Sequence, residues 1–236
     1  MKNCSMIKKK LSAILLIGGS GKRFGTASPK QYQLLVDKPV WIWAAQTLYA
    51  TDGIDELIVV CDLAFCDTVL SDVEKYGLAE RTHLTGGGAT RQDSVLNGCL
   101  AATGDIVIIH DGARPFVPKS IAKAIRLISD STDENYCVAM GLPVTDTLRN
   151  AKTYDTINRD ELWKMQTPQL MYRSQLIKAL HYCKENKIIV TDDVAAMHAI
   201  GCRLDFVVGS RDNLKMTTQD DLPFAEFIAK RLFDEQ

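Results

Sequence analysis

A glycine-rich loop with two cations follows the first apolar run of the chain. The loop reads Gly18-Gly19-Ser20-Gly21-Lys22-Arg23 and comes directly after residues Ser12–Ile17. Glycines let backbone N–H groups approach phosphate oxygens without a Cβ in the way, and the cations add positive charge where a triphosphate would lie. The loop is therefore a candidate triphosphate site, although, read alone, it is better explained as a tight turn with a solvated basic flank.

Two common nucleotide motifs do not fit this loop. The spacing G-x-x-x-x-G-K-[ST] of a P-loop is absent. A dinucleotide-binding fingerprint would place its third glycine where Phe24 stands, and would end the second strand in an acidic residue that the chain lacks. These mismatches disfavour an NAD-dependent oxidoreductase. Lys30, in Pro29-Lys30-Gln31, adds another cation close to the loop.

A second glycine cluster, Gly86-Gly87-Gly88, comes just before a helical pattern that begins near Ser94. Consecutive glycines allow the backbone to pack against a flat base. The hydroxyl of Ser94 is a candidate partner for the edge of that base, and it is also a candidate helix cap. The sequence leaves these two interpretations open.

An acidic residue follows a third apolar run, Ile106–Ile109, in His110-Asp111-Gly112-Ala113-Arg114. A carboxylate just past a buried strand lies at the edge of the sheet where open α/β proteins bind their ligands. Mg²⁺ prefers oxygen ligands and is often held by one carboxylate together with substrate phosphates. Asp111 is therefore the candidate metal ligand. Arg114 is a candidate partner for this carboxylate.

The elements that must position these residues alternate between short apolar runs and longer helical patterns. Expected strands cover residues 12–17, 56–60, 82–85, 106–110, 136–141 and 204–208, and expected helices cover 41–49, 64–75, 94–102, 120–128, 173–184, 192–199 and 220–233. This alternation predicts an α/β fold, a doubly wound, mostly parallel Rossmann-like sheet with helices on both faces. Gly18, Gly87 and Asp111 would then lie on one sheet edge, an arrangement suited to phosphoryl or nucleotidyl transfer.

The alternation breaks at Pro143. Residues 145–157 are polar and partly β-prone, which fits either a projecting hairpin arm or a surface loop. Beyond them lie Arg159, Thr167, Thr191 and Lys215 in polar segments that precede or begin helices. Read alone, Thr191 is a candidate helix cap, and Arg159 and Lys215 are candidates for surface ion pairs.

Length and composition narrow the class of protein. The chain has 236 residues, 46% of them hydrophobic and 24% charged, with a net charge of −1. A balanced charge argues against a nucleic-acid partner. The seven cysteines are scattered without a C-x-x-C pair, which argues against a zinc or redox site. Unpaired cysteines are typical of proteins in the reducing cytoplasm. Leu11–Ile17 is too short for a membrane helix, so we expect a buried strand there.

Together these segments resemble the 2-C-methyl-D-erythritol 4-phosphate cytidylyltransferases of the non-mevalonate isoprenoid pathway, over about Ser12 to Phe227. Each matching piece is short, and their order and number make the set specific. The pieces are Gly18–Gly25, Pro29-Lys30-Gln31, Gly87-Gly88 with Arg91 and Asp93-Ser94-Val95, His110–Pro115, Pro143-Val144, Asp146-Thr147, Arg159 with Leu162-Trp163, Thr167-Pro168-Gln169, Thr191-Asp192-Asp193, and Asn213 with Lys215 and Thr217.

The resemblance implies an enzyme that joins CTP to 2-C-methyl-D-erythritol 4-phosphate and releases pyrophosphate, with Mg²⁺ as cofactor. Its implied catalytic residues are Arg23, Lys30, Arg159 and Lys215. The implied nucleotide-binding residues are Gly18, Gly19, Gly21, Lys22, Gly87, Gly88, Ser94 and Gly112, with Asp111 as metal ligand and Thr147, Thr167 and Thr191 as substrate-binding residues.

The family also implies one nucleotidyltransferase domain over residues 1–236, in which 142–165 form a dimerisation arm. This arm crosses to a partner, so Arg159 would complete the neighbour's site in a homodimer. We expect no nucleic acid or membrane among its partners, and a cytoplasmic location, or a plastid one in a plant-like source.

Two other functions compete with this interpretation. A ribitol-5-phosphate cytidylyltransferase shares the glycine-rich loop and the Thr-Pro-Gln segment, but it fits Pro143-Val144, Leu162-Trp163 and the Thr-Asp-Asp set less well. A catalytically silent nucleotide-binding module would be expected to lack some of the catalytic cations and carboxylates, but this chain retains them.

Overall fold

The computed structural model describes residues 9–19 and 29–234. Its centre is a seven-stranded sheet with the order β11-β7-β10-β6-β1-β4-β5. The strands are β1 (Leu11–Leu16), β4 (Glu56–Cys61), β5 (Thr82–Gly86), β6 (Ile106–Asp111), β7 (Tyr136–Pro143), β10 (Trp163–Tyr172) and β11 (Arg203–Val208). All neighbours in the sheet pair in parallel except β10, which runs antiparallel to both β6 and β7.

The central strands are buried on both faces because their side chains alternate between two hydrophobic clusters. Along β1, Ala13 and Leu15 join one cluster, whereas Ile14 joins the other. Along β6, Ile108 faces the first cluster and Ile109 the second. A strand with apolar residues on both faces reads as a continuous apolar run, which is why these strands are recognisable in the sequence.

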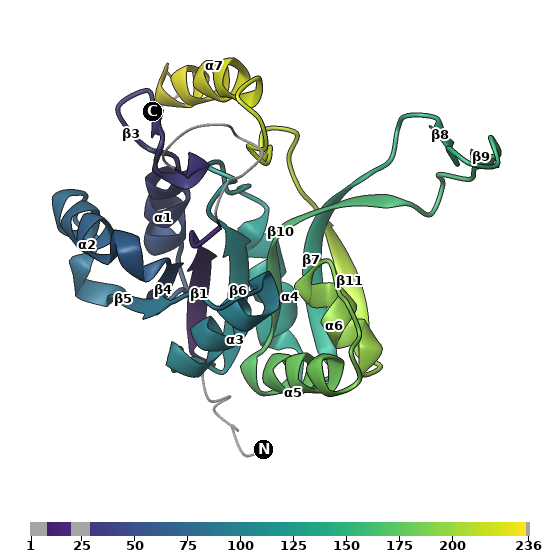
Figure 1. The fold of residues 1–236 in the computed structure, drawn as a ribbon. Coiled ribbons are helices and arrows are strands. Elements are labelled where there is room, and N and C mark those ends of the chain that lie inside the picture. Colours follow the sequence, from purple (N-terminus) through teal and green to yellow (C-terminus); the bar gives the residue numbers. More distant parts are fainter. Residues whose placement is uncertain (1–8, 20–28, 235–236) are drawn as a thin grey trace, which may run out of the picture.

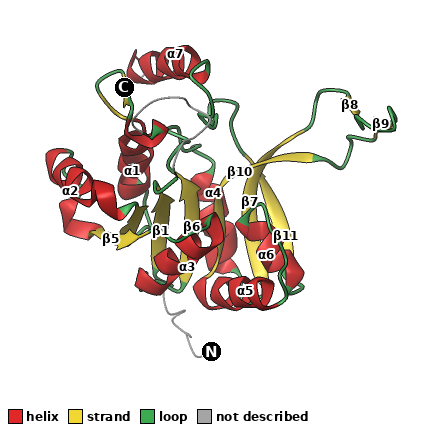
Figure 2. Cartoon of the chain, in the orientation of Figure 1, coloured by secondary structure: helices red, strands yellow, loops and turns green. Residues whose placement is uncertain are grey.

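Helices cover both faces of the sheet (Figures 1 and 2). The first cluster includes residues of α1 (Val40–Ala50), α2 (Cys66–Lys75) and α4 (Ile121–Asp130). The second includes residues of α3 (Arg91–Ala101), α5 (Arg173–Glu185) and α6 (Asp193–Ala199). The last helix, α7 (Asp221–Asp234), packs in a third cluster near β2 (Leu34–Leu35), next to β3 (Lys38–Pro39). The predicted doubly wound α/β fold is confirmed.

Strand β10 is the largest element that the sequence pattern did not predict. Its apolar residues Leu170 and Met171 are fully buried, but Gln166 to Gln169 interrupt the run. The register with β7 shifts between Met165 and Gln169, so this polar stretch forms an irregularity inside the sheet. Proline is tolerated at such irregularities because no ladder hydrogen bond is required there.

The polar segment after Pro143 is a projecting arm, not a surface loop. Figure 1 shows it leaving the body between β7 and β10 and ending far from the sheet. Two short antiparallel strands, β8 (Leu148–Arg149) and β9 (Thr156–Ile157), form its outer part. Because the arm is exposed almost throughout, packing within this chain does not account for its shape.

A buried carboxylate, Glu56, lies at the end of the sheet opposite to the carboxyl ends of the parallel strands and accepts several hydrogen bonds. Glu56 is 5% exposed and accepts hydrogen bonds from the Ser12 hydroxyl at 2.5 Å, the Thr103 N–H at 2.7 Å and the Thr103 hydroxyl at 2.9 Å. Burial by itself would raise the pKa of Glu56, but these bonds outweigh burial and leave the pKa lowered. Glu56 thus ties β1, β4 and the start of β6 together.

Replacing Glu56 by glutamine is expected to lower the free energy of unfolding at pH 7 by about 1–3 kcal/mol, because the amide loses the charge that strengthens the three hydrogen bonds to Oε1 and puts an N–H donor in place of the Oε2 that lies 3.8 Å from the Lys10 ammonium. A lowered folded pKa stabilises the fold above the unfolded pKa of about 4.3, and that stabilisation is lost as the pH falls through the folded value. Urea unfolding from pH 7 to pH 3 should therefore show a shallower loss for Glu56→Gln than for wild type. Glu74→Gln, at an exposed position of α2, serves as the control. A Glu56→Gln profile that coincides with wild type would contradict this role.

Within the described residues, no helix is long and apolar enough to cross a membrane. Six cysteines fall in this part of the chain, and all are free thiols: Cys61, Cys66, Cys99, Cys137, Cys183 and Cys202.

Candidate active site

Strand register brings the predicted loops to one edge of the sheet. Leu16, the last residue of β1, pairs with Asp111 of β6 and with Val60 of β4. Cys61, at the end of β4, pairs with Gly86 of β5. The segments after these strands therefore start side by side, as expected for parallel strands that end at one edge.

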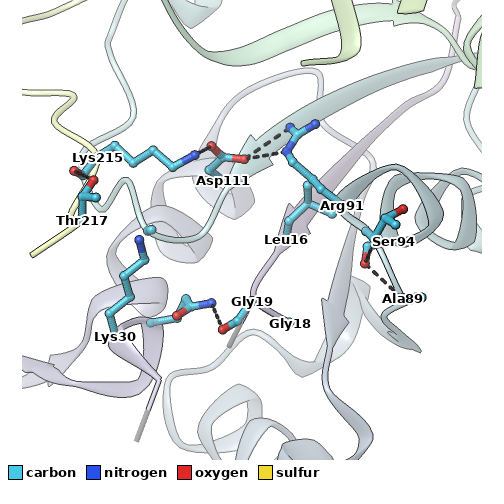
Figure 3. Close-up of a pocket in the computed structure, with 14 residues that line it drawn as sticks. Leu16, Gly18, Gly19, Lys30, Ala89, Arg91, Ser94, Asp111, Lys215 and Thr217 are labelled. Atoms are coloured by element: carbon cyan, nitrogen blue, oxygen red, sulfur yellow. Dashed lines mark hydrogen bonds and ion pairs between the residues drawn. The ribbon is translucent and has the colours of Figure 1, made fainter. Parts of the chain in front are cut away.

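A cavity of about 520 Å³ opens at this edge (Figure 3). Its walls combine backbone from the two glycine segments with four charged side chains, those of Lys30, Arg91, Asp111 and Lys215. The lining residues are Leu16, Gly18, Gly19, Lys30, Gln31, Gly88, Ala89, Thr90, Arg91, Ser94, Asp111, Ala113, Lys215 and Thr217. A concave site with converging polar groups is the usual setting for a small-molecule ligand.

The second glycine segment is fixed by the start of α3. Thr90 caps this helix in a capping box with Asp93, so Thr90 and not Ser94 is the cap. The Ser94 hydroxyl instead donates to the Thr90 carbonyl at 2.9 Å and accepts from the Gly88 N–H at 3.0 Å. A Cβ on Gly88 would lie 2.3 Å from the Cβ of Asp93, so only glycine fits there.

Asp111 lies at the centre of the charged wall, 9% exposed. Its Oδ2 accepts from the Lys215 ammonium at 2.6 Å, and its Oδ1 accepts from the Arg91 Nη2 at 3.3 Å (Figure 3). Burial would raise the pKa of Asp111, but Arg91 and Lys215 outweigh burial and hold the pKa well below its usual range. Asp111 is therefore a carboxylate at neutral pH.

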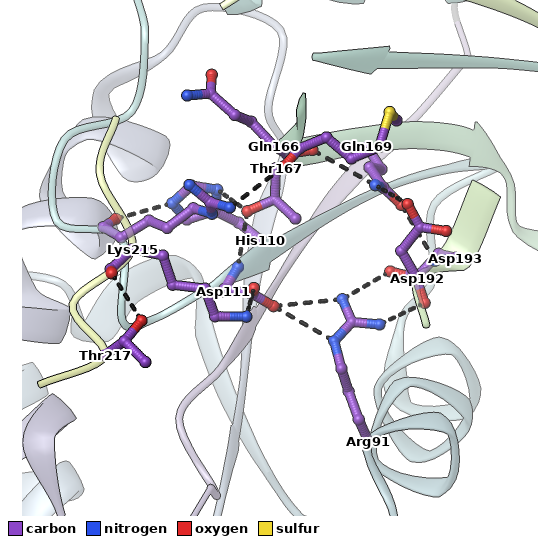
Figure 4. Close-up of polar contacts among 12 residues, drawn as sticks. Arg91, His110, Asp111, Gln166, Thr167, Gln169, Asp192, Asp193, Lys215 and Thr217 are labelled. Carbon is purple, nitrogen blue, oxygen red and sulfur yellow. Dashed lines mark hydrogen bonds and ion pairs between the residues drawn. The ribbon is translucent and has the colours of Figure 1, made fainter. Parts of the chain in front are cut away.

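Arg91 connects this carboxylate to a second, fully buried one. Its Nη1 and Nη2 donate to the two oxygens of Asp193 at 3.0 and 2.8 Å, a bidentate pair (Figure 4). Asp193 is 1% exposed and its backbone N–H donates to the Gln169 side chain at 3.1 Å. The pair fixes the guanidinium beside Asp111, because two parallel bonds leave its plane little freedom.

Lys215 is positioned by the residues on either side of it. Asn213 is fully buried and donates to the Thr167 carbonyl at 2.7 Å, while its own carbonyl accepts from Arg114 at 2.7 Å. Met216 is also buried, and its N–H donates to the Ala113 carbonyl at 2.9 Å. Arg114 thus anchors the Lys215 segment. Among the described residues, the side-chain hydrogen bonds to Asp111 come from Arg91 and Lys215, and not from Arg114 as the sequence suggested.

Behind Asp111, Thr167 and His110 form a buried polar wall. The Thr167 hydroxyl accepts from the Asp111 N–H at 3.1 Å and lies 3.0 Å from the His110 Nδ1 (Figure 4). The His110 Nε2 lies 3.0 Å from the Arg114 carbonyl, so Nε2 carries the proton and Nδ1 accepts from Thr167. Burial lowers the pKa of His110 to about 4, and the ring is neutral near pH 7.

The donor set suits a metal that is shared with a ligand. Among residues 9–19 and 29–234, no group of three or more histidine, cysteine or acidic side chains gathers to hold an ion. Mg²⁺ commonly uses one or two carboxylates, with water and substrate phosphates completing its shell. An ionised Asp111 on the cavity wall fits this pattern, whereas a closed metal cage does not.

The sequence profile of the 2-C-methyl-D-erythritol 4-phosphate cytidylyltransferases matches residues 11–231, nearly the whole chain. The chain belongs to this family. The cytidylyltransferase of Syntrophus aciditrophicus is 33% identical over 95% of this chain and 98% of its own length. The chloroplastic cytidylyltransferase of rice is 34% identical over 97% of this chain and 76% of its own length.

Solved cytidylyltransferase structures share the fold. The 4-diphosphocytidyl-2C-methyl-D-erythritol synthase of Anaerococcus prevotii aligns with a TM-score of 0.81 and 25% identity over 94% of this chain and 97% of its own. The Francisella tularensis cytidylyltransferase aligns with a TM-score of 0.77 and 27% identity over 93% and 99% of the two chains. Both cover nearly all of this chain.

Seven residues predicted for a cytidylyltransferase site line the described part of the cavity: Gly18, Gly19, Lys30, Gly88, Ser94, Asp111 and Lys215. Figure 3 shows Lys30 and Lys215 reaching toward the same space from different segments. Gly21, Lys22 and Arg23 lie outside the described residues. The roles assigned to all of these residues stay predictions.

Other predicted residues lie behind or away from the cavity. Gly87 donates its N–H to the Cys61 carbonyl at 2.8 Å, and a Cβ on Gly112 would lie 2.4 Å from the Ile17 side chain. Close packing thus requires glycine at 112. Thr191 is exposed beside α6, whose cap is Asp192 and not Thr191. On the arm, Thr147 and Arg159 are both exposed, and the Arg159 guanidinium donates to the Thr145 carbonyl.

Arg91, Asp193 and Gln31 are site residues to which sequence reasoning gave no role. Arg91 and Asp193 are far apart in the chain and pair only in the folded structure. Their positions after the glycine cluster and in the Thr-Asp-Asp segment were the available signals. The Gln31 amide donates to the Ile17 and Gly19 carbonyls.

Proposed function

We propose that this chain carries out the reaction of its family at the cavity, joining CTP to 2-C-methyl-D-erythritol 4-phosphate with release of pyrophosphate. An oxygen of the sugar phosphate attacks the α-phosphorus in line, the new P–O bond forms, and the bond between the α- and β-phosphates breaks. The observation that carries the proposal is the Asp111–Lys215 pair of 2.6 Å in the same cavity as Lys30 and the Gly18–Gly19 backbone.

The reaction requires electrostatics and positioning rather than proton abstraction. A phosphate dianion is already a nucleophile near neutral pH, so no general base is needed. His110 is buried, neutral and occupied by Thr167 and Arg114, in keeping with a supporting role. Lys30 and Lys215 would offset the charge that gathers on the triphosphate and on the acceptor phosphate.

For the nucleotide, Gly18 and Gly19 would offer backbone to the triphosphate, while Gly88 and Ser94, which line the same cavity, would contact the cytosine and ribose. Asp111 would hold Mg²⁺ together with the triphosphate. A bound Mg²⁺ would neutralise phosphate charge. Asp111 is paired with Arg91 and Lys215. If Lys215 moved to a phosphate, the Oδ2 of Asp111 would become available to Mg²⁺.

For the acceptor, we propose a homodimer in which the arm, residues 142–165, places Arg159 and Thr147 at the partner's cavity. Supporting this, both residues are exposed on an arm that extends away from its own body (Figure 1). Thr167 supports Asp111 from behind, and we propose that Thr191 faces the acceptor. Scattered free thiols favour a cytoplasmic location.

The deciding experiment measures pyrophosphate release with CTP, ATP, GTP and UTP, each with 2-C-methyl-D-erythritol 4-phosphate and with ribitol 5-phosphate. We expect release only with CTP and the methylerythritol phosphate. Release only with ribitol 5-phosphate would overturn the acceptor, and no release with any pair would favour a silent nucleotide-binding module. Heat-treated protein provides the background rate.

A further inference from the structure

Gln31 connects the two described stems of the first glycine-rich loop. Its side chain is 4% exposed and its Nε2 donates to the Gly19 carbonyl at 2.9 Å and to the Ile17 carbonyl at 3.1 Å. Ile17 and Gly19 lie on the stem that leaves β1, and Gln31 lies on the stem that returns, in the 3-10 turn Lys30–Tyr32. One amide group therefore joins the two stems.

Both contacts require an amide donor at this position. Two carbonyl oxygens face the same nitrogen, so a carboxylate in its place would bring acceptors against acceptors. A Cβ on Gly19 would lie 3.3 Å from Nε2, so a larger residue there would make the Gln31 amide shift by a few tenths of an ångström. The Oε1 is shielded from solvent and accepts no hydrogen bond from the described residues. Gln31 is thus committed to the loop rather than open to a ligand.

A fixed carbonyl fixes the plane of its peptide unit, since the peptide bond is planar. The bond from Gln31 to Ile17 therefore also sets the direction of the Gly18 N–H, which points opposite to the Ile17 carbonyl. Lys30 directly precedes Gln31 in the same 3-10 turn, and Lys30 and Gly19 both line the cavity. In this way the Gly18 N–H and the Lys30 ammonium are positioned near each other before an anionic ligand binds.

We propose that Gln31 is a positioning residue that pre-organises the Gly18–Gly19 backbone and Lys30 for the β- and γ-phosphates of the nucleotide. The inference rests on the proposed function, because it assigns this loop to a triphosphate. It predicts that Gln31 contributes to binding of the terminal phosphates and contributes little to binding of the base, ribose and α-phosphate. CTP and CMP differ in these terminal phosphates, and their affinities separate the two contributions.

The test is calorimetric titration of wild type, Gln31→Glu and Gln31→Met with CTP and with CMP, in buffer containing Mg²⁺. We expect Gln31→Glu to weaken CTP binding about tenfold or more while CMP binding changes less than about twofold. Gln31→Met, which removes the donor without adding charge, should shift the CTP affinity in the same direction by less. Gln46→Glu is the matched control, since Gln46 on α1 accepts from Lys38 at 2.7 Å and glutamate keeps that acceptor.

A general structural role would weaken CTP and CMP equally, and that result in the two Gln31 variants would overturn the inference. An unchanged ratio of CTP to CMP affinity in both would overturn it as well. If Gln31→Glu does not fold, as judged by its thermal unfolding, Gln31→Met decides the question. A wild-type protein that binds CTP no more tightly than CMP would instead contradict the proposed function, so the two failures are distinguishable.

Discussion

Replacing Lys215 by alanine is expected to lower kcat about 10²–10³-fold, the usual loss when one preorganised electrostatic group is removed from an active site. The ammonium lies 2.6 Å from Asp111 and is held there by buried neighbours, Asn213 and Met216. We expect it to bind the acceptor phosphate during the reaction. Its loss would remove that contact and also leave Asp111 with Arg91 as its remaining hydrogen-bonded cation among the described residues.

Steady-state rates of pyrophosphate release check this prediction. Lys178→Ala, at an exposed position of α5, is the control for loss of a lysine. Lys215→Arg keeps the charge but changes the donor geometry, so we expect it to recover part of the lost rate. A Lys215→Ala enzyme with the wild-type kcat would remove Lys215 from the mechanism, and a fall in thermal stability equal to that of a core substitution would indicate a structural role instead.

The central sheet could be predicted because its strands carry a local signal. Ile106–Ile109 and Leu57–Val60 are buried on both faces, so each appears in the sequence as an apolar run. Parallel strands end at one edge, and this rule alone is enough to place Gly18 and Asp111 together. The register of Leu16 with Asp111 confirms that placement.

Strand β10 could not be predicted in the same way, because the buried polar residues that support the site interrupt its apolar run. Gln166 and Gln169 are buried polar side chains that hold the Ser210 and Asp193 segments, and Thr167 supports Asp111. Each pairing joins residues that are far apart in the chain, and no local period encodes such a contact. The Arg91–Asp193 pair was missed for the same reason: charge and position were visible, but the partner was not.

The arm lies between these two cases. Its polar, β-prone composition allowed either a hairpin or a loop, and the family resemblance decided for the arm. Figure 1 shows the arm extended from the body. Its function, however, depends on a second chain, and the exposed Arg159 and Thr147 make this dependence testable.

Mixed dimers of Lys30→Ala and Arg159→Ala subunits are expected to recover activity that neither variant has alone. If the arm reaches the partner's cavity, one of the two sites in each mixed dimer combines an intact Lys30 with an intact Arg159. Random exchange of subunits makes about half of the dimers mixed, so activity should rise to about a quarter of the wild-type level. Pyrophosphate release, measured after the two variants are refolded together, gives this value.

The matched control is a mixture of Lys30→Ala with Lys215→Ala. Both lysines line the cavity of one chain, so every site in a mixed dimer lacks one of them and no recovery is expected. Recovery in this control would show that the variants regain activity by some route other than arm exchange. No recovery in the Lys30→Ala and Arg159→Ala mixture, with mixed dimers present by mass, would mean that Arg159 serves its own chain. The arm would then have to bend back to its own cavity, because the described Arg159 side chain bonds to Thr145 on the arm itself.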